Sequence, residues 1–311
     1  AHEERRSGPQ GILSTLFRQY QLSSQFDALR PSTRAEYVRH IAKIERAFGT
    51  LPLAALDDRR TRGVILDWRD QIARRSPRQA DHLVAVLRLV LAWSVDRGLI
   101  ARNPIERPGR VHTATRAEKI WRDADLAALE AVASPEIWLA VTLAVETGQR
   151  QGDLLRLPWS AWDGAHLTLR QSKTGKRVDV RATRRLREAL GRAPRLSTLI
   201  LTSSRGRPWT ADGFKTSFGK AKAAAKIEGL TFHDLRGTAA TRLAEAGASA
   251  IQIAAVTGHS VKDVDGILER HYVAPTRALG DAAIERLENA RAAKTSNQSS
   301  NRAESAPKID P

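Results

Sequence analysis

The chain has 311 residues, of which 41% are hydrophobic and 27% charged, a balance typical of folded domains. It contains no cysteine, which excludes a disulfide framework, a thiolate zinc site and a cysteine nucleophile. Its 51 lysines and arginines against 34 acidic residues give a formal net charge of +17, which predicts a polyanionic partner, and we expect nucleic acid.

Residues 1–10 are charged and lack the apolar core of a signal peptide, so we expect a disordered leader there. No apolar run approaches the length that crosses a bilayer. Together these features predict a cytoplasmic protein without a membrane partner.

Residues 11–103 show the apolar spacing of helices throughout. Helices are predicted from the recurrence of Leu13, Leu16, Phe17 and Tyr20, and over residues 31–49, 57–75 and 76–99. Ser32 and Thr33 are expected to cap the second of these helices, and Ser76 with Pro77 to begin the last. We therefore expect a small all-α domain, followed by a proline-rich linker at 104–119.

Residues 120–289 combine helical spacing with a short region of strict alternation. Alternating residues at 165–171 and 176–182, joined by the turn at 172–175, predict a β-hairpin, and 197–203 reads as a third strand. Helices are predicted at 123–133, 135–148, 210–227, 231–247, 249–258 and 276–294. The predicted fold class is mainly α with a small antiparallel β-sheet (α+β), ending in a polar, disordered tail at 290–311.

Short sequence motifs of this second domain contain reactive and cationic side chains. They are Arg150 in TGQRQGDLL, Lys173 in SKTGK, His233 and Arg236 in FHDLRGTAAT, His259 in TGHS and Tyr272 in ERHYVAP. Each alone has an ordinary interpretation, such as an ion pair between Arg150 and Asp153. Together they supply arginines that match a tetrahedral phosphate, a proton donor, two imidazoles and a hydroxyl nucleophile. The nearby acidic residues are single and scattered, so we expect displacement at phosphorus with no metal and no other cofactor.

At these residues the sequence resembles the tyrosine recombinase (phage integrase) family, over about residues 11–289, and most closely the integrases of bacterial prophages and other mobile elements. The resemblance implies that Tyr272 attacks a DNA phosphodiester and forms a 3′-phosphotyrosyl link. It implies that Arg150, Arg236 and His259 hold the non-bridging oxygens. Lys173 would be the general acid, His233 would assist the tyrosine proton, and Asp153 would orient Arg150.

Two features depart from the family pattern. His259 and Tyr272 are 13 positions apart, which is about one helical turn longer than the family's usual spacing. Asp153 stands where the family more often has glutamate. Tyr272 remains the predicted nucleophile because only Tyr20 and Tyr37 compete and both lie in the helical domain. His271 is interpreted as a bystander.

The first domain resembles the family's core-binding domain, which closes over the opposite face of the DNA. The predicted phosphate contacts, any of which could equally belong to a solvated basic face, are Arg34, Arg39, Lys43, Arg74, Arg75 and Arg78. Many phage integrases have a further N-terminal arm-binding domain, and we expect this chain to start after that point.

The resemblance also implies partners and a place in the cell. The helix after Tyr272 carries an apolar stripe that would dock on a neighbouring protomer or pack within its own chain, at Leu279, Ala283, Ile284 and Leu287. The working form would be a homotetramer on two sites of double-stranded DNA, helped by a directionality factor or a host DNA-bending protein. Such a protein would associate with the bacterial nucleoid.

Integration or excision of a mobile element is the function that the resemblance favours. A resolvase of chromosome or plasmid dimers would share every catalytic residue and differ in its DNA substrate. A type IB topoisomerase would share the tyrosine attack without strand exchange. A DNA-binding regulator that lost catalysis is the alternative from another class, and the complete set of catalytic residues argues against it.

Overall fold

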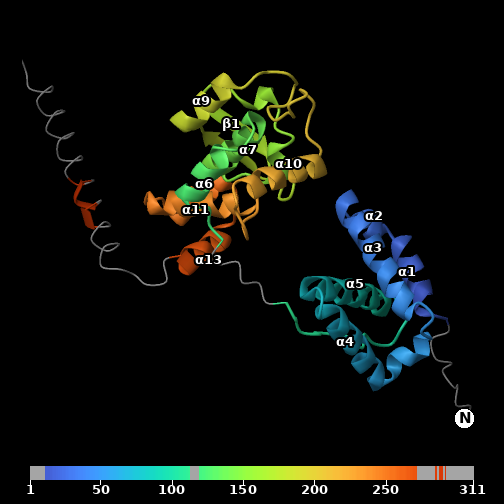
Figure 1. Ribbon diagram of the computed structural model, residues 1–311. Coiled ribbons are helices and arrows are strands. Elements are labelled where there is room, and N and C mark those ends of the chain that lie inside the picture. Colours follow the sequence, from blue (N-terminus) through green and yellow to red (C-terminus); the bar gives the residue numbers. More distant parts are fainter. Residues whose placement is uncertain (1–10, 113–118, 272–283, 286, 290, 292–311) are drawn as a thin grey trace, which may run out of the picture. The chain divides into compact units, whose positions relative to one another are not determined.

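The computed structural model (Figure 1) describes residues 11–112 and 119–271, together with residues 284, 285, 287–289 and 291. The chain divides into two compact units between Thr115 and Arg116, which lies inside the predicted linker. The predicted leader, and the predicted tail except for residue 291, lie outside the described residues. Within the described residues, no helix combines the length and the apolar character needed to cross a membrane.

The named secondary-structure elements in the described part of the first unit are all helices, as the sequence predicts. Its elements are α1 (Leu13–Gln21), α2 (Ser24–Asp27), α3 (Pro31–Phe48), the 3-10 helix η1 (Leu53–Asp57), α4 (Arg59–Ala73) and α5 (Pro77–Asp96). Helix α5 is the centre of this unit, because it packs against α1, α3 and α4 and buries Leu87, Val90 and Leu91 completely. Ser76 and Pro77 begin α5 as predicted, whereas Arg30 is the N-cap of α3. The predicted cap at Ser32 and Thr33 is wrong because Pro31, with its fixed φ, already starts the helix.

The beginning of the predicted linker is part of the first unit. Ile105 is fully buried in its core. Side chains of α4 and α5 hold the segment through hydrogen bonds to its backbone: Arg62 to the carbonyl of Pro104, Arg69 to that of Pro108, and Asp81 to the amides of Val111 and His112. The proline content predicted a linker from residue 104 onward. The contacts that fix this segment come from side chains that lie 30 to 42 residues earlier in the sequence.

In its described part, the second unit combines helices with one two-stranded sheet. Its elements are α6 (Asp123–Glu130), α7 (Pro135–Thr147), α8 (Gln151–Leu154), η2 (Trp159–Ala161), β1 (His166–Arg170), β2 (Arg177–Arg181), α9 (Arg184–Arg192), α10 (Ala211–Ala224), α11 (Asp234–Glu245), α12 (Ala250–Thr257) and α13 (Val261–His271). The helices predicted between residues 123 and 258 are confirmed, and α8, α9 and α13 add to them.

The predicted hairpin is confirmed and the predicted third strand is wrong. Strands β1 and β2 pair antiparallel, with Leu167 opposite Val180 on the buried face. Within 197–203, Leu199 and Thr202 form only isolated bridges, with Pro158 and Pro208. Proline has no backbone N–H, so these partners cannot extend a ladder of hydrogen bonds.

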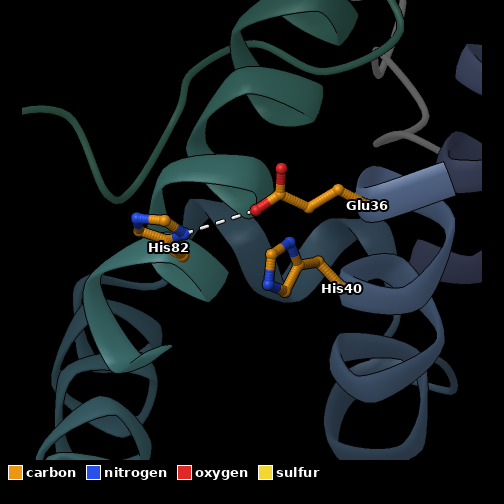
Figure 2. Close-up of side chains that lie close together, drawn as sticks. All are labelled: Glu36, His40 and His82. Atoms are coloured by element: carbon orange, nitrogen blue, oxygen red, sulfur yellow. Dashed lines mark ion pairs between the residues drawn. The ribbon is translucent and has the colours of Figure 1, made fainter. Parts of the chain in front are cut away.

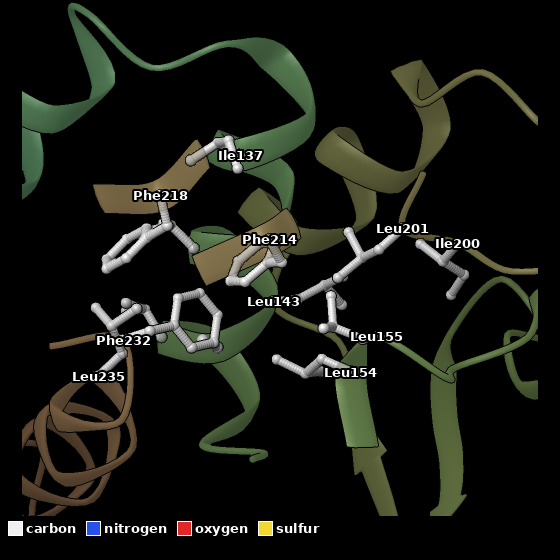
Figure 3. Packing of buried hydrophobic residues seen from close by; sticks show 14 of the residues in the cluster. Ile137, Leu143, Leu154, Leu155, Ile200, Leu201, Phe214, Phe218, Phe232 and Leu235 are labelled. Carbon is white, nitrogen blue, oxygen red and sulfur yellow. The ribbon is translucent and has the colours of Figure 1, made fainter. Parts of the chain in front are cut away.

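Aromatic packing fixes the position of α11, which carries Arg236 and begins directly after His233 (Figure 3). Phe214 and Phe218 of α10 both meet the ring of Phe232 edge to face, with centroids 5.0 and 5.2 Å apart. Phe232 directly precedes His233. The buried indole of Trp121 donates to the carbonyl of Thr231, on the same segment (3.0 Å). The start of α11 is therefore held from two sides.

The predicted C-terminal helix at 276–294 lies largely outside the described residues. Leu279 and Ala283 are among those outside. Ile284 and Leu287 are described, have helical backbone and are exposed. Docking of this stripe on a neighbouring protomer stays a prediction.

Candidate active site

Arg150 stands on a sharp turn that only glycine permits. The C-cap of helix α7 is Gly148, whose φ of 64° is left-handed. A Cβ on Gly148 would lie 2.7 Å from Cγ2 of Thr257, so the turn also requires the absence of a side chain. Arg150 follows two residues later as the N-cap of α8. The same close contact brings the C-terminal ends of α7 and α12 together.

Arg236 is buried between these two helix ends. Its Nη1 donates to the carbonyl oxygen of Gly148 (2.5 Å) and to that of Thr257. Such C-terminal carbonyls carry partial negative charge, which stabilises a guanidinium without neutralising it. Its Nη2 is buried with no hydrogen-bond partner among the described residues. Arg236 is thus firmly anchored and retains donor capacity for an anion.

The electrostatics of Arg236 show an excess of positive charge. Burial, and secondly repulsion by Arg150, lower the pKa of Arg236 to about 10, with Asp153 and Asp263 opposing the change. The side chain therefore stays charged at neutral pH. Within the described part of the chain, neither arginine forms an ion pair with a carboxylate.

No ion pair joins Arg150 to Asp153, the carboxylate that was expected to orient it. Arg150 instead donates from Nη1 to Oε1 of Gln171 (2.9 Å). Oδ1 of the buried Asp153 accepts from the backbone amide of Ser172 (2.9 Å) and lies 3.5 Å from Nη2 of Arg156. Oδ1 of this carboxylate, which lies in the single turn of α8, therefore contacts the hairpin, whereas Oδ2 is buried with no hydrogen-bond partner among the described residues. Asp153 thereby holds Ser172, the residue that directly precedes Lys173.

Gln171 is a residue of this site that sequence reasoning missed. Its side chain is fully buried, and its Nε2 donates to Oε1 of Gln149 (2.7 Å) and to the carbonyl of Thr257 (2.9 Å). Oε1 accepts from Thr174 as well as from Arg150. One amide therefore joins the arginine turn, the hairpin and the end of α12. A signal existed, because the alternation of Leu167 and Leu169 continues to a buried, polar position 171.

His259 follows the end of α12 in a fixed orientation. The C-cap of helix α12 is Gly258, whose φ is 71°, and Nδ1 of His259 lies 2.8 Å from Oγ1 of Thr257. That hydroxyl already donates its proton to the carbonyl of Ile253 (2.7 Å). It can therefore only accept from the ring, which places the proton of the neutral imidazole on Nδ1.

The charge state of His259 is set by its neighbours. Burial, then Arg236 and Arg150, lower its pKa to about 4, while Asp263 opposes them. The imidazole is thus neutral at pH 7. His233 is the N-cap of α11, three positions before Arg236, and is exposed. Hydrogen bonds through Gln171 and Thr257 link Arg150, Arg236 and His259.

The two remaining residues of the predicted catalytic set are Lys173 and Tyr272. Lys173 is exposed in the hairpin turn, two positions after the buried Gln171. Tyr272 lies outside the described residues, as does the side chain of His271. Helix α13 occupies most of the long spacing from His259 and ends at His271, directly before Tyr272.

The predicted phosphate contacts of the first unit lie on three segments. Arg34, Arg39 and Lys43 are on α3, Arg74 and Arg75 follow α4, and Arg78 is in the first turn of α5. Arg34 is half-buried and lies 3.8 Å from Asp27, whereas the others are exposed. Their contact with DNA stays a prediction.

Comparison with known proteins finds similarity to phage integrases and to a DNA recombinase. Residues 123–274 match the Phage integrase family. The chain is 29% identical over 228 residues to the integrase of Escherichia phage HK022, covering 68% of this chain and 63% of that protein. It is 36% identical over 126 residues to a shufflon-specific DNA recombinase of Escherichia coli, covering 40% of this chain and 32% of the relative. The match thus spans less than two thirds of the length of these relatives.

Solved structures show the same fold. A lambda integrase fragment (residues 75–356), solved as a dimer bound to a COC′ core site, superposes with a TM-score of 0.72 at 24% identity, over 83% of this chain and 95% of that one. A lambda integrase tetramer bound to a Holliday junction gives a TM-score of 0.70 at 23% identity, over 84% and 82% of the two chains.

Proposed function

The chain belongs to the phage integrase (tyrosine recombinase) family through the domain at residues 123–274, and on this premise we propose that it is a site-specific DNA recombinase. One observation carries the proposal. The amide of Gln171 holds Arg150 and two helix ends hold Arg236, and neither arginine forms an ion pair with a carboxylate within the described residues. A phosphodiester is the anion that two guanidinium groups and an imidazole match best.

The proposed reaction is a displacement at phosphorus that conserves the phosphodiester energy. The Tyr272 oxygen forms a bond to phosphorus while the bond to the 5′-oxygen breaks, and a 3′-phosphotyrosyl link results. His233 accepts or orients the tyrosine proton, and Lys173 gives a proton to the departing 5′-oxygen. A 5′-hydroxyl of the partner strand then attacks the phosphotyrosine and releases Tyr272. No ATP is consumed, since one ester replaces another.

The cationic residues stabilise the charge that develops in each step. Arg150 and Arg236 are already in place before DNA arrives, so little reorganisation is needed during the reaction. The imidazole of His259 faces the same charge cluster and gains affinity for a proton as the phosphate approaches. Asp153 positions the hairpin turn through the amide of Ser172, and Gln171 positions Arg150. Neither is proposed to contact the phosphate.

The first unit is proposed to bind the DNA duplex through the exposed basic residues of α3, of the end of α4 and of α5. A homotetramer on two DNA sites is the proposed working form, which the tetrameric lambda integrase on a Holliday junction supports as a structural relative. A directionality factor or a host DNA-bending protein would assist, and the protein would act at the bacterial nucleoid in the cytoplasm. Likeness to phage integrases favours integration or excision of a mobile element.

The direct test uses a suicide DNA duplex with a nick beside the scissile phosphate, so that the short cleaved fragment diffuses away. The DNA flanking the gene supplies the candidate site. Wild type is expected to form an adduct that survives SDS, whereas Tyr272→Phe binds the duplex without forming one. An adduct with Tyr272→Phe would overturn the assignment of the nucleophile. Binding by wild type with no adduct would favour the regulator alternative.

A two-duplex assay separates the remaining alternatives. Strand exchange between two duplexes is the expected result, whereas relaxation of supercoiled DNA without exchange would favour a topoisomerase. Activity on flanking DNA with a direct repeat supports an integrating element. Activity restricted to dimer-resolution sites would favour a resolvase.

A further inference from the structure

Two histidines and a glutamate of the first unit meet across α3 and α5. Glu36 and His40 are one helical turn apart on α3, and His82 comes from α5. Figure 2 shows the three side chains pointing toward one another from these two helices. One ligand atom of each residue lies within 4.8 Å of the others. His40 and His82 are 42 positions apart in the sequence, so no local sequence motif indicates the cluster.

The distances suit a small, four-coordinate metal ion. Nδ1 of His82 lies 3.6 Å from Oε1 of Glu36. Two ligands on a tetrahedral zinc ion, each bonded at about 2.0–2.1 Å, are separated by about 3.4 Å. The rings of His40 and His82 stand edge to face with centroids 6.0 Å apart. Small rotations of the side chains would therefore complete the coordination without a change in the helices.

Two further observations point to a ligand at this place. Nδ1 of His40 is buried and has no hydrogen-bond partner within the described residues. A buried polar atom usually has a partner, so its lack of one requires an explanation. The cluster also lines a cavity of about 400 Å³, together with Thr33, Tyr37 and Arg88. This cavity leaves room for a water molecule as a fourth ligand.

We propose that Glu36, His40 and His82 bind one divalent transition-metal ion, for which zinc is the appropriate probe. Two imidazoles and a carboxylate form a ligand set that zinc accepts, with one position left for water. Magnesium prefers oxygen ligands and is not expected to compete. Arg39 and Lys43 lie within one turn of His40 on α3, and their positive charges oppose a cation at this site.

The ion would fasten α3 to α5 at the surface that carries the predicted phosphate contacts. Arg39 and Lys43 flank His40 on α3, and Arg78 precedes His82 by one turn on α5. A metal bridge would fix the spacing of these cations before DNA binds. This role concerns the helical unit and does not depend on the proposed recombination chemistry.

The test titrates the full chain with zinc chloride, measured by calorimetry and by competition with a chromophoric chelator. One zinc ion per chain is expected. His40→Gln and His82→Gln each remove a ligand nitrogen at similar size, and at least about a tenfold loss of affinity is expected, the scale that even outer-sphere changes reach. His112→Gln is the matched control, because His112 is exposed and outside the cluster. Magnesium chloride should produce no heat of binding.

Two measurements keep the result decisive. Circular dichroism verifies that each variant is folded, and zinc should raise the Tm of wild type but not of His82→Gln. His259→Gln should bind zinc as wild type does, because His259 belongs to the other unit. The proposal is overturned if wild type binds no zinc, if His40→Gln and His82→Gln bind it as wild type does, or if His259→Gln abolishes binding.

Discussion

Oε1 of Gln171 accepts a hydrogen bond from Nη1 of Arg150 at 2.9 Å, and the same buried amide donates to the end of α12. A neutral side chain thus orients an arginine that was expected to rely on a carboxylate. An amide fixes the direction of the guanidinium but leaves its charge available to a phosphate.

Gln171→Ala tests this positioning role. The substitution removes the acceptor of Arg150 and leaves Oε1 of Gln149 without its donor. A misplacement of about 1 Å in an active site can cost about a hundredfold in rate, and we expect a loss of that order in adduct formation under single-turnover conditions. DNA affinity, measured by mobility shift, should change little. Gln71→Ala, at an exposed position of α4, is the control. Wild-type cleavage by Gln171→Ala would contradict the role.

Arg236→Lys separates charge from geometry. Lysine keeps the positive charge but cannot bond the carbonyls of Gly148 and Thr257 and still present a second nitrogen to a phosphate. We expect cleavage to fall by about a hundredfold or more, the scale seen when one charge-stabilising donor is removed. Arg242→Lys is the control, because Arg242 lies on the same helix and pairs with Asp123 near the surface. Equal rates for the two variants would show that the buried geometry is unimportant.

His259 should make folding stability depend on pH. Its pKa of about 4 lies below the ordinary value of 6.5, so the folded protein binds this proton less readily than the unfolded chain does. The stability contributed by the neutral ring is complete above about pH 6.5 and is lost as the pH falls toward 4. Denaturant unfolding at pH 7 and pH 5 should therefore show a larger loss for wild type than for His259→Gln. Identical losses would contradict the lowered pKa.

Gly258→Ala should disturb the site through its backbone. The φ of 71° already disfavours a side chain by about 1 kcal/mol, and a Cβ would lie 2.3 Å from Nε2 of Gln171. We expect a lower Tm together with slower adduct formation. Gly219→Ala is the control in the middle of α10, where a Cβ meets nothing within 4 Å and alanine should stabilise by about 0.5–1 kcal/mol. A neutral effect of Gly258→Ala would mean that Gln171 can move freely.

Local patterns in the sequence predicted most of the fold. The alternation of Leu167, Leu169, Val178 and Val180 marked the hairpin, and the helices from 123 to 258 followed from apolar spacing. The third strand failed because strand formation needs a partner, and Pro158 and Pro208 cannot supply a ladder. The cap of α3 failed because Pro31 starts the helix before Ser32.

The site was predictable in its residue types but not in its connections. The motifs identified Arg150, Arg236 and His259, and the structure brings them together. Proximity in sequence suggested Asp153 as the partner of Arg150, yet the direction of a short side chain in one helical turn is set by tertiary packing. The link from Gln171 to Thr257 spans 86 residues, and no local pattern reports such a contact.

Tyr272 is the residue that we propose becomes covalently linked to DNA. Adduct trapped on the suicide duplex, digested with protease and nuclease, should yield one modified peptide, with the nucleotide attached to Tyr272. The chain has three tyrosines, and Tyr20 is buried in the helical core, which leaves Tyr37 as the accessible competitor. Attachment at Tyr272 is the predicted result. Attachment at Tyr37, or at any serine, would contradict the account.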